Sequence, residues 1–563
     1  MAARGEHTGA EDGFRDVLAA RRHKLGRNHP DTLATWFSLA QEMAARGDHA
    51  GAQEQFRDVF TARQRTLGRD HPDTLAVRFS LAREMAACGD HAGAENEFSD
   101  VLATQQRTLG RDHPDTLATR SAIAQQLAAR GDHAGAEEKF WHVFTARQRT
   151  LGADHPDTLA TRFSLAQERA ARGDHIRAEE EFRKLLAVRQ RTLGRDHPDT
   201  LATRFSIAQE MAARGDHAGA ENVFRDVLVA RQRTLGPEHP GTLTAWFSIA
   251  QERAARGEHT AAEEEFREVL AVRQRTLGPE HPDTLATRFS IAQEMAARGD
   301  HAGAEDEFRY VLTVQMLILG SDHPDTLIVR FNVAREMAAR EDHTGAEEQF
   351  REMLPQLERR LGPDHPDTQA PRFSIAQEMA ARGDHAGAEE EFRVVLAARR
   401  RTLGAEHPDT LLAWFSIAQE MAAAGHHAGA EDEFRHVLPL LRRTLGPDHP
   451  DTLATRFSIA REMAAQGDHA EAEDEYRDVL PHLERRLGPD HPITLVLWSS
   501  VAREMAARGD YAGAAAQFQD MLPFLQRKLG PDHPDTRAAI EWIDYIQGKR
   551  DNPDSGPPPG PGG

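Results

Sequence analysis

The strongest constraint in this sequence is a His-Pro pair that recurs at one fixed interval. The pair begins at positions 29, 71, 113, 155, 197, 239, 281, 323, 365, 407, 449, 491 and 533, and every interval is 42 residues. Self-similarity at a period of about 20 to 50 residues is typical of solenoids, in which each repeat packs mainly against its two neighbours. The length of 563 residues therefore counts modules of one array and not independent globular domains.

Within one repeat, apolar residues return at the three- and four-residue spacing of an amphipathic helix. In the first half of one unit they are Leu75, Phe79, Leu81, Ala82 and Met85. Pro72 favours a helix start there, because the first turn does not use its missing N–H group, and Gly89 favours a stop. A second helix is expected from about Asp90 to Leu109, with carboxylates early and an arginine late, as the helix dipole favours.

A set of apolar and small residues recurs across these predicted hairpins as W-x2-L-A-x2-M…G-x-H-x2-A-x3-F-x2-V. One copy is formed by Trp36, Leu39, Ala40, Met43, Gly47, His49, Ala52, Phe56 and Val59. This pattern resembles the tetratricopeptide repeat (TPR). The longer unit, with L-G-x-D-H-P-D-T between hairpins, is similar to the repeats of kinesin light chains and of long actinobacterial arrays. The resemblance implies an all-α fold, a right-handed α-solenoid or superhelix of tandem TPR hairpins.

The repeat register predicts the organisation of the chain. We expect residues 1–26 to be a partial repeat with the second helix only, and residues 27–536 to form twelve repeats. Residues 537–547 are predicted to form a C-terminal capping helix. Residues 548–563, rich in Pro and Gly, are predicted to be a disordered tail. Because Met1 lies in mid-module, we expect a larger natural protein, a misplaced start, or a free end formed by a second helix.

Several residues depart from the repeat in the C-terminal third. Four second helices contain a proline, which removes a backbone hydrogen bond, and we expect these helices to be kinked. The four are Pro355, Pro439, Pro481 and Pro523. Pro371 inside a first helix, and Glu341 at the position of a stop glycine, predict irregular structure in the same neighbourhood.

The resemblance also implies a groove lined mainly by first helices, and it supplies the candidate binding residues. They are Phe205, Gln209, Phe247, Gln251, Phe289, Gln293, Phe331 and Arg335. The Phe series either contacts an extended peptide or packs as core between helices. The Gln and Arg series either pairs with peptide amides and carboxylates or is a solvated face. The Asn that kinesin light chains tend to place at the Phe step is replaced here.

Composition and motif content argue against several classes of function. A formal net charge of -21 argues against binding to nucleic acid or to an anionic membrane surface. The single cysteine, Cys88, excludes a disulfide framework and fits a reducing cytoplasm, and no apolar run reaches the roughly 20 residues of a membrane span. The histidines lack the spacing of metal ligands, and the repeated serines lack a unique catalytic partner. We expect no catalytic residues, no metal and no cofactor.

These observations leave three hypotheses for function. The first is a non-enzymatic cytoplasmic scaffold that binds a protein or peptide along its concave groove. The second is the C-terminal sensor array of a larger signalling protein, with an ATPase or another effector upstream. The third is a structural or self-associating rod.

Overall fold

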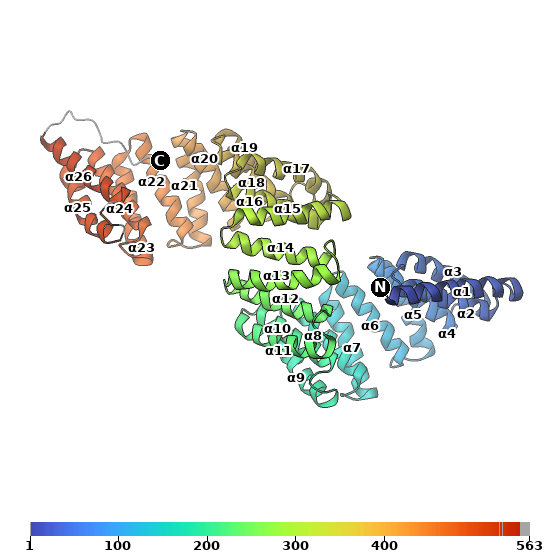
Figure 1. Cartoon of the computed structure of the whole chain (residues 1–563). Coiled ribbons are helices and arrows are strands. Elements are labelled where there is room, and N and C mark those ends of the chain that lie inside the picture. Colours follow the sequence, from blue (N-terminus) through green and yellow to red (C-terminus); the bar gives the residue numbers. More distant parts are fainter. Residues whose placement is uncertain (1, 529, 532, 552–563) are drawn as a thin grey trace. The chain divides into compact units, whose positions relative to one another are not determined.

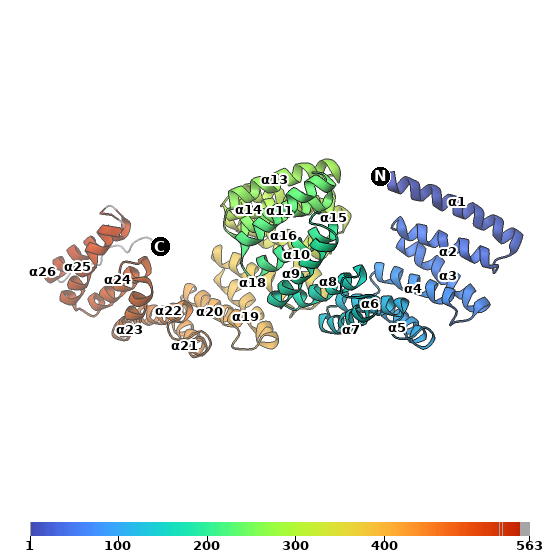
Figure 2. The same cartoon turned by 90° about the horizontal axis from the view of Figure 1, so that it is seen from below.

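The computed structural model describes residues 2–528, 530–531 and 533–551, which contain twenty-six α-helices and no strand. The chain divides into two compact units, Met1–Pro279 and Glu280–Gly563. Within each unit, every helix packs against the helix before it and the helix after it. Figure 1 shows these antiparallel hairpins stacked in chain order, and Figure 2 shows the same helices from a second side. The predicted fold class, an all-α solenoid of tandem hairpins, is confirmed.

The first unit contains thirteen helices among its described residues. Their bounds are α1 (Ala2–Leu25), α2 (Pro30–Ala45), α3 (His49–Leu67), α4 (Pro72–Ala87), α5 (His91–Thr108), α6 (Pro114–Ala129), α7 (His133–Leu151), α8 (Pro156–Ala171), α9 (His175–Thr192), α10 (Pro198–Ala213), α11 (His217–Leu235), α12 (Pro240–Ala255) and α13 (His259–Thr276).

The second unit also contains thirteen helices among its described residues. Their bounds are α14 (Pro282–Ala297), α15 (His301–Ile318), α16 (Pro324–Ala339), α17 (His343–Leu361), α18 (Pro366–Ala381), α19 (His385–Thr402), α20 (Pro408–Ala423), α21 (His427–Thr444), α22 (Pro450–Gln466), α23 (His469–Leu487), α24 (Pro492–Ala507), α25 (Tyr511–Lys528) and α26 (Pro534–Asp551). In both units the even-numbered helices are the first helices of the repeat, and the odd-numbered helices are the second.

The His-Pro pair marks the start of every first helix because both of its residues serve the helix terminus. In α4, Pro72 is the first helical residue, and the Nδ1 atom of His71 accepts a hydrogen bond of 3.2 Å from the backbone N–H of Asp73. The second helix of the repeat is capped by Asp90, whose carboxylate accepts from the N–H of Gly93 at 2.8 Å. Each cap pairs a backbone donor that the helix itself leaves free.

The core of each hairpin contains two facing alanines and one aromatic ring, which is a phenylalanine except in the hairpin of α22 and α23, where it is Tyr476. In the second repeat, Ala82 of α4 and Ala94 of α5 are fully buried, and Phe98 of α5 lies beside them. Two methyl side chains allow the helix backbones to approach closely, and the ring fills the space on one side of that contact. The same arrangement recurs with the 42-residue period in both units.

The prolines inside helices do not interrupt them. The helix α17 passes through Pro355 and has 19 residues, as does α3, which contains no internal proline. The first helix α18 passes through Pro371 and has the usual 16 residues. The prediction of irregular structure is therefore wrong as far as helix length is concerned. Each helix keeps its length with one backbone hydrogen bond fewer, at the exposed Pro355 and at the buried Pro371 alike. The expected kinks stay a prediction.

The C-terminal end of the array differs from the expected bounds, whereas the N-terminal end agrees with them. A single helix, α1 with 24 residues, occupies the predicted partial repeat 1–26, and the last helix, α26, has 18 residues and reaches Asp551. Residues 548–551, which the sequence assigned to a disordered tail, thus continue this helix, which also begins three residues before the predicted 537. The remainder of the predicted tail, 552–563, lies outside the described residues.

Glu341 is the one described residue other than glycine with a positive φ, at 65°. Its equivalent one repeat earlier is Gly299, with φ 84° and open space around the position of a Cβ atom. Left-handed backbone costs a side-chain-bearing residue roughly 1–2 kcal/mol, whereas glycine adopts it freely but loses more entropy on folding. We therefore expect Glu341→Gly to raise the free energy of unfolding by up to about 1 kcal/mol.

Gly299→Glu is the matched reverse change and should lower the free energy of unfolding by about 1 kcal/mol. Urea denaturation followed by circular dichroism measures both effects as shifts of the midpoint. A lower midpoint for Glu341→Gly than for the unchanged chain would contradict this account.

Candidate functional site

The predicted binding residues lie on four first helices, two in each unit. In the first unit, α10 carries Phe205 and Gln209, and α12 carries Phe247 and Gln251. In the second unit, α14 carries Phe289 and Gln293, and α16 carries Phe331 and Arg335. The two sets are described separately, each within its own unit.

Each candidate phenylalanine is half-buried and packs against the buried phenylalanine of its own hairpin. In the first unit the ring centroids of Phe205 and Phe224 are 4.9 Å apart, and those of Phe247 and Phe266 are 5.0 Å apart. The pairs of the second unit repeat this geometry: Phe289 and Phe308 at 5.1 Å, and Phe331 and Phe350 at 5.3 Å. These distances are typical of favourable tilted aromatic pairs. The candidate rings are therefore part of the packing between helices, although each keeps some accessible surface.

In the first unit a recurring arginine of the second helix covers the rings of Phe205 and Phe247, a feature that the sequence analysis did not identify. In the second unit the equivalent residues are Gln315 and Leu357. The guanidinium of Arg231 lies 5.0 Å from the ring centroid of Phe205 and donates to the backbone oxygen of Gly241 at 2.7 Å. Burial lowers the pKa of Arg231 from its usual value. The only signal in the sequence is the recurrence of arginine in the A-R-Q-R-T-L-G segment, and the contact itself requires the stacked hairpins.

The polar candidates are exposed and lie beside a row of His–Glu pairs. Gln209 and Gln251 have solvent-exposed side chains. The residue that follows Gln251 is Glu252, whose carboxylate lies 2.8 Å from the Nδ1 atom of His217 in the preceding repeat. In the second unit, Glu336 follows Arg335 and pairs with His301 at 2.8 Å. The glutamate next to each of Gln251 and Arg335 is thus paired with a histidine of the preceding repeat, whereas the Gln and Arg side chains face solvent.

Hollows open on the first-helix face between consecutive first helices. In the first unit, a hollow of about 480 Å³ between α4 and α6 is lined by Leu75 and Phe79. In the second unit, a hollow of about 360 Å³ lies between α16 and α18, and one of about 210 Å³ lies between α24 and α26. All three occupy equivalent positions of the repeat. Phe331 is the candidate residue that lines one of them.

Three exposed apolar residues of the second unit border this face and were not identified from the sequence. Ile328 is 54% exposed, Leu412 is 50% exposed and Val496 is 48% exposed. Ile328 and Val496 line the two hollows of the second unit. All three stand at the position where most repeats have the alanine of the T-L-A segment, so the substitution of alanine was a signal available in the sequence.

The described part of the chain contains no group of three or more His, Cys, Asp or Glu side chains placed to hold a metal ion. Among the described helices, none combines the length and the apolar character needed to cross a membrane. Cys88 is a free, exposed cysteine.

Comparison with protein families identifies the repeat. Two models of the tetratricopeptide repeat match the chain and together cover more than half of it. The chain belongs to the tetratricopeptide repeat family. The first model matches residues 169–232, 252–315, 427–485 and 463–527. The second matches residues 1–31, 38–73, 74–115, 116–157 and 374–409. A search of curated proteins gave no match.

Solved structures similar to this TPR protein include kinesin light chain-like repeats. A structure of nearly identical kinesin light chain TPR-like repeats from Podosopora anserina is 26% identical, with a TM-score of 0.35, and the match covers 37% of this chain and 98% of that one. BtubC (BKLC) of P. vanneervenii is 17% identical, with a TM-score of 0.35, and the match covers 44% and 94%. The apo form of RapI is 10% identical, with a TM-score of 0.45, and the match covers 70% and 98%.

The two rings of one aromatic pair should differ in their contribution to stability. Phe266 is 1% exposed, whereas Phe247 is half-buried. We expect Phe266→Ala to lower the free energy of unfolding by about 3–5 kcal/mol, because it leaves a cavity in the hairpin core. Phe247→Ala should cost less than half as much, since part of its ring already faces solvent.

Chemical denaturation of the two variants tests this difference. Phe247→Leu is the control that keeps most of the apolar volume and should cost the least of the three. Equal losses for Phe247→Ala and Phe266→Ala would assign Phe247 wholly to the core and remove it from the candidate binding surface.

Proposed function

We propose that this TPR protein is a non-enzymatic scaffold that binds an extended segment of a partner protein along its first-helix face. The observation that carries the proposal is the repetition of one feature. Hollows of about 360 and 210 Å³ recur at equivalent positions of the second unit, each beside an exposed aliphatic side chain. A regular series of small apolar hollows suits side chains that are spaced along an extended peptide.

The candidate polar residues would bind the backbone and the charged groups of the peptide whose apolar side chains enter the hollows. Gln293 and Arg335 lie one helical turn beyond Phe289 and Phe331 on the same first helices, and both are exposed. An amide side chain can donate to and accept from a peptide backbone, and a guanidinium can pair with a carboxylate. In the first unit, we propose the same role for Gln209 and Gln251, beside Phe205 and Phe247.

The surrounding contacts support binding without large rearrangement. The half-buried phenylalanines are held by their partner rings, and the helices that carry them are held by ion pairs between neighbouring hairpins. A surface that is ordered before binding loses less conformational entropy when a ligand binds. We further propose a cytoplasmic location, in keeping with the free and exposed thiol of Cys88.

A triple substitution tests the proposal without disturbing the core. Ile328→Asp and Val496→Asp place charges at the two hollows of the second unit, and Leu412→Asp places one at the equivalent position of α20, all at side chains that are about half exposed. We expect the triple variant to keep the melting temperature within a few degrees and to lose, in quantitative cross-linking and affinity purification from source cells, the proteins that the unchanged chain retains.

The control places the same three charges on second helices of the same unit. Tyr310→Asp, Leu317→Asp and Val394→Asp change exposed residues of α15 and α19. This control should retain the same partners as the unchanged chain. If the first-helix variant retains them too, or if the control loses them equally, the first-helix face is not the binding surface.

A further inference from the structure

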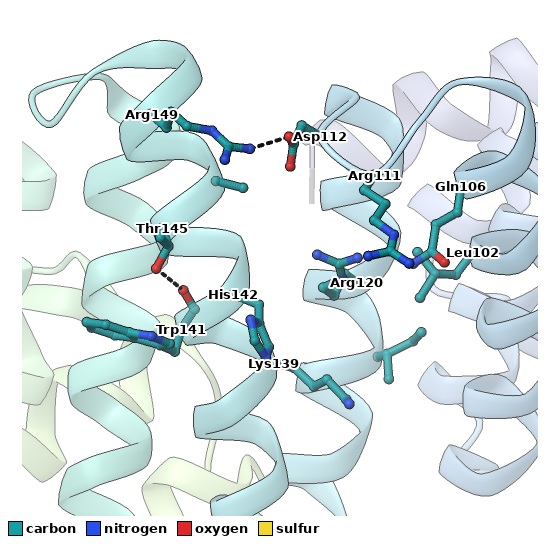
Figure 3. A pocket seen from close by; sticks show the side chains of 12 residues that line it. Leu102, Gln106, Arg111, Asp112, Arg120, Lys139, Trp141, His142, Thr145 and Arg149 are labelled. Atoms are coloured by element: carbon teal, nitrogen blue, oxygen red, sulfur yellow. Dashed lines mark hydrogen bonds and ion pairs between the residues drawn. The ribbon is translucent and has the colours of Figure 1, made fainter.

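A second surface of the first unit departs from the repeat in its charge. A cavity of about 560 Å³ lies on the second-helix side, between α5 and α7 and above α6. Figure 3 shows the side chains that line it. Five basic residues line it: Arg111 in the loop before α6, Arg120 on α6, and Lys139, His142 and Arg149 on α7. None of them belongs to the first-helix face described above.

In the preceding repeat, the equivalent positions form a closed set of ion pairs. Arg78 of α4 donates to Glu97 at 2.5 Å and also to Asp100, both on α5. Arg69, in the loop before α4, donates to Asp100 at 3.0 Å. Two carboxylates of the second helix thus neutralise two arginines, and the arginine of the first helix is largely buried among them.

The repeat that follows keeps both arginines and replaces both carboxylates with basic side chains. Arg111 and Arg120 stand 42 residues after the two arginines of the preceding repeat, and Lys139 and His142 stand 42 residues after its two carboxylates. Figure 3 shows Lys139 and His142 on the side of α7 that faces Arg120, with Arg111 beside Arg120. The indole of Trp141 points away from this group. Four basic side chains therefore share one cavity with Arg149, which is bonded to Asp112.

The acidic residues near this cavity compensate its basic side chains only in part. Asp112 is the only acidic residue among those that line it, and it accepts a hydrogen bond from Arg149 at the rim. Glu138 lies 3.7 Å from the Nε2 atom of His142, and both of these side chains are more than half exposed. In the next repeat one carboxylate returns: Glu181 lies 2.9 Å from the first-helix arginine Arg162 and also pairs with Lys184, which stands at the position of His142.

The electrostatics of Arg120 reflect this loss of partners. Burial lowers its pKa, Asp112 raises it, and the neighbouring charge of Arg111 lowers it again. In the preceding repeat, burial also lowers the pKa of Arg78, but the bonds to its two carboxylates outweigh burial and raise the pKa overall. The cavity thus holds positive charge for which the chain itself supplies little compensation, in a protein whose net charge is -21.

We propose that this cavity binds a phosphate monoester through Arg111, Arg120 and Lys139, with His142 as a further donor. A phosphate monoester carries about -1.5 to -2 charges near neutral pH and offers three acceptor oxygens, whereas a carboxylate carries one charge. Two guanidinium groups and an ammonium group match this number of oxygens better than they match a single carboxylate.

The cavity also has room for the group to which the phosphate is attached. Its volume of about 560 Å³ falls within the range of roughly 300–1,000 Å³ that is usual for small-molecule sites. Leu102, Ile123 and Ala146 supply apolar lining beside the basic residues. The phosphate can belong to a free metabolite or to a phosphorylated side chain of a protein, and binding measurements distinguish the two sources.

Isothermal titration calorimetry of the full chain tests the proposal with inorganic phosphate, with a phosphoserine peptide, and with the same peptide carrying Ser or Glu in place of phosphoserine. We expect one site for a phosphate-bearing probe, with affinity at least tenfold above that of the Ser and Glu peptides. Tighter binding of the phosphopeptide than of inorganic phosphate assigns the site to phosphorylated protein. Equal binding of the two assigns it to free phosphate compounds.

The decisive variant restores the acidic residues of the preceding repeat. Lys139→Glu with His142→Asp re-creates the charge pattern around Arg78, so we expect the melting temperature to be kept or raised while phosphate affinity falls at least tenfold. Arg57→Glu with His23→Asp changes the net charge equally at exposed positions of α3 and α1 and should bind as the unchanged chain does.

The reverse transfer provides an independent test. Glu97→Lys with Asp100→His should create a second site, so that the stoichiometry rises from one to two. The proposal is overturned if Lys139→Glu with His142→Asp binds as tightly as the unchanged chain, if no phosphate-bearing probe binds the unchanged chain, or if the Glu peptide binds as tightly as the phosphopeptide.

Discussion

The close contact between two alanines in each hairpin determines the spacing on which the rest of this structure depends. Ala208 of α10 and Ala220 of α11 are both fully buried, and Phe224 fills the space beside them. A larger side chain at either alanine would separate the helices and leave the ring without its contacts, at a cost typical of overpacked cores. Because the contact recurs in each repeat, the spacing of the two helices within a hairpin is the same along the array, and hairpins of one shape stack on one another.

Charged side chains then fix how one hairpin stacks on the next. Glu221 of α11 is almost fully buried, and its two carboxylate oxygens accept from Arg253 at 3.2 Å and from Arg256 at 2.7 Å, both at the end of the next first helix. Burying a carboxylate is favourable only when such partners are present. Ion pairs between hairpins therefore align neighbouring repeats together with the apolar core. When a basic residue replaces a carboxylate in one repeat, the partner arginine there loses its ion pair.

Each of the two proposed surfaces arises where residues differ from those at the same position in most other repeats. On the first-helix face, alanines are exchanged for larger aliphatic residues, such as Ile328, and the surface becomes more apolar. On the second-helix side, two carboxylates are exchanged for Lys139 and His142, and the surface becomes basic. In both cases the helices that carry the changed residues keep the bounds of their neighbours. A repeat fold allows this because the core residues and the surface residues occupy different positions of the unit.

The sequence alone determined the helices, their order and their family, because the 42-residue period and the Ala–Phe pattern specify local structure and nearest-neighbour packing. It also placed Phe331 and Arg335 on the correct helix, since helical periodicity is a local property. Only the tertiary structure decided that Phe331 packs on Phe350 while also lining a hollow, and that Arg111 and Arg120 line one cavity with Lys139 and His142. These residues are 19 to 31 positions apart, and their relative placement depends on how separate helices pack against each other, which no pattern within one helix specifies.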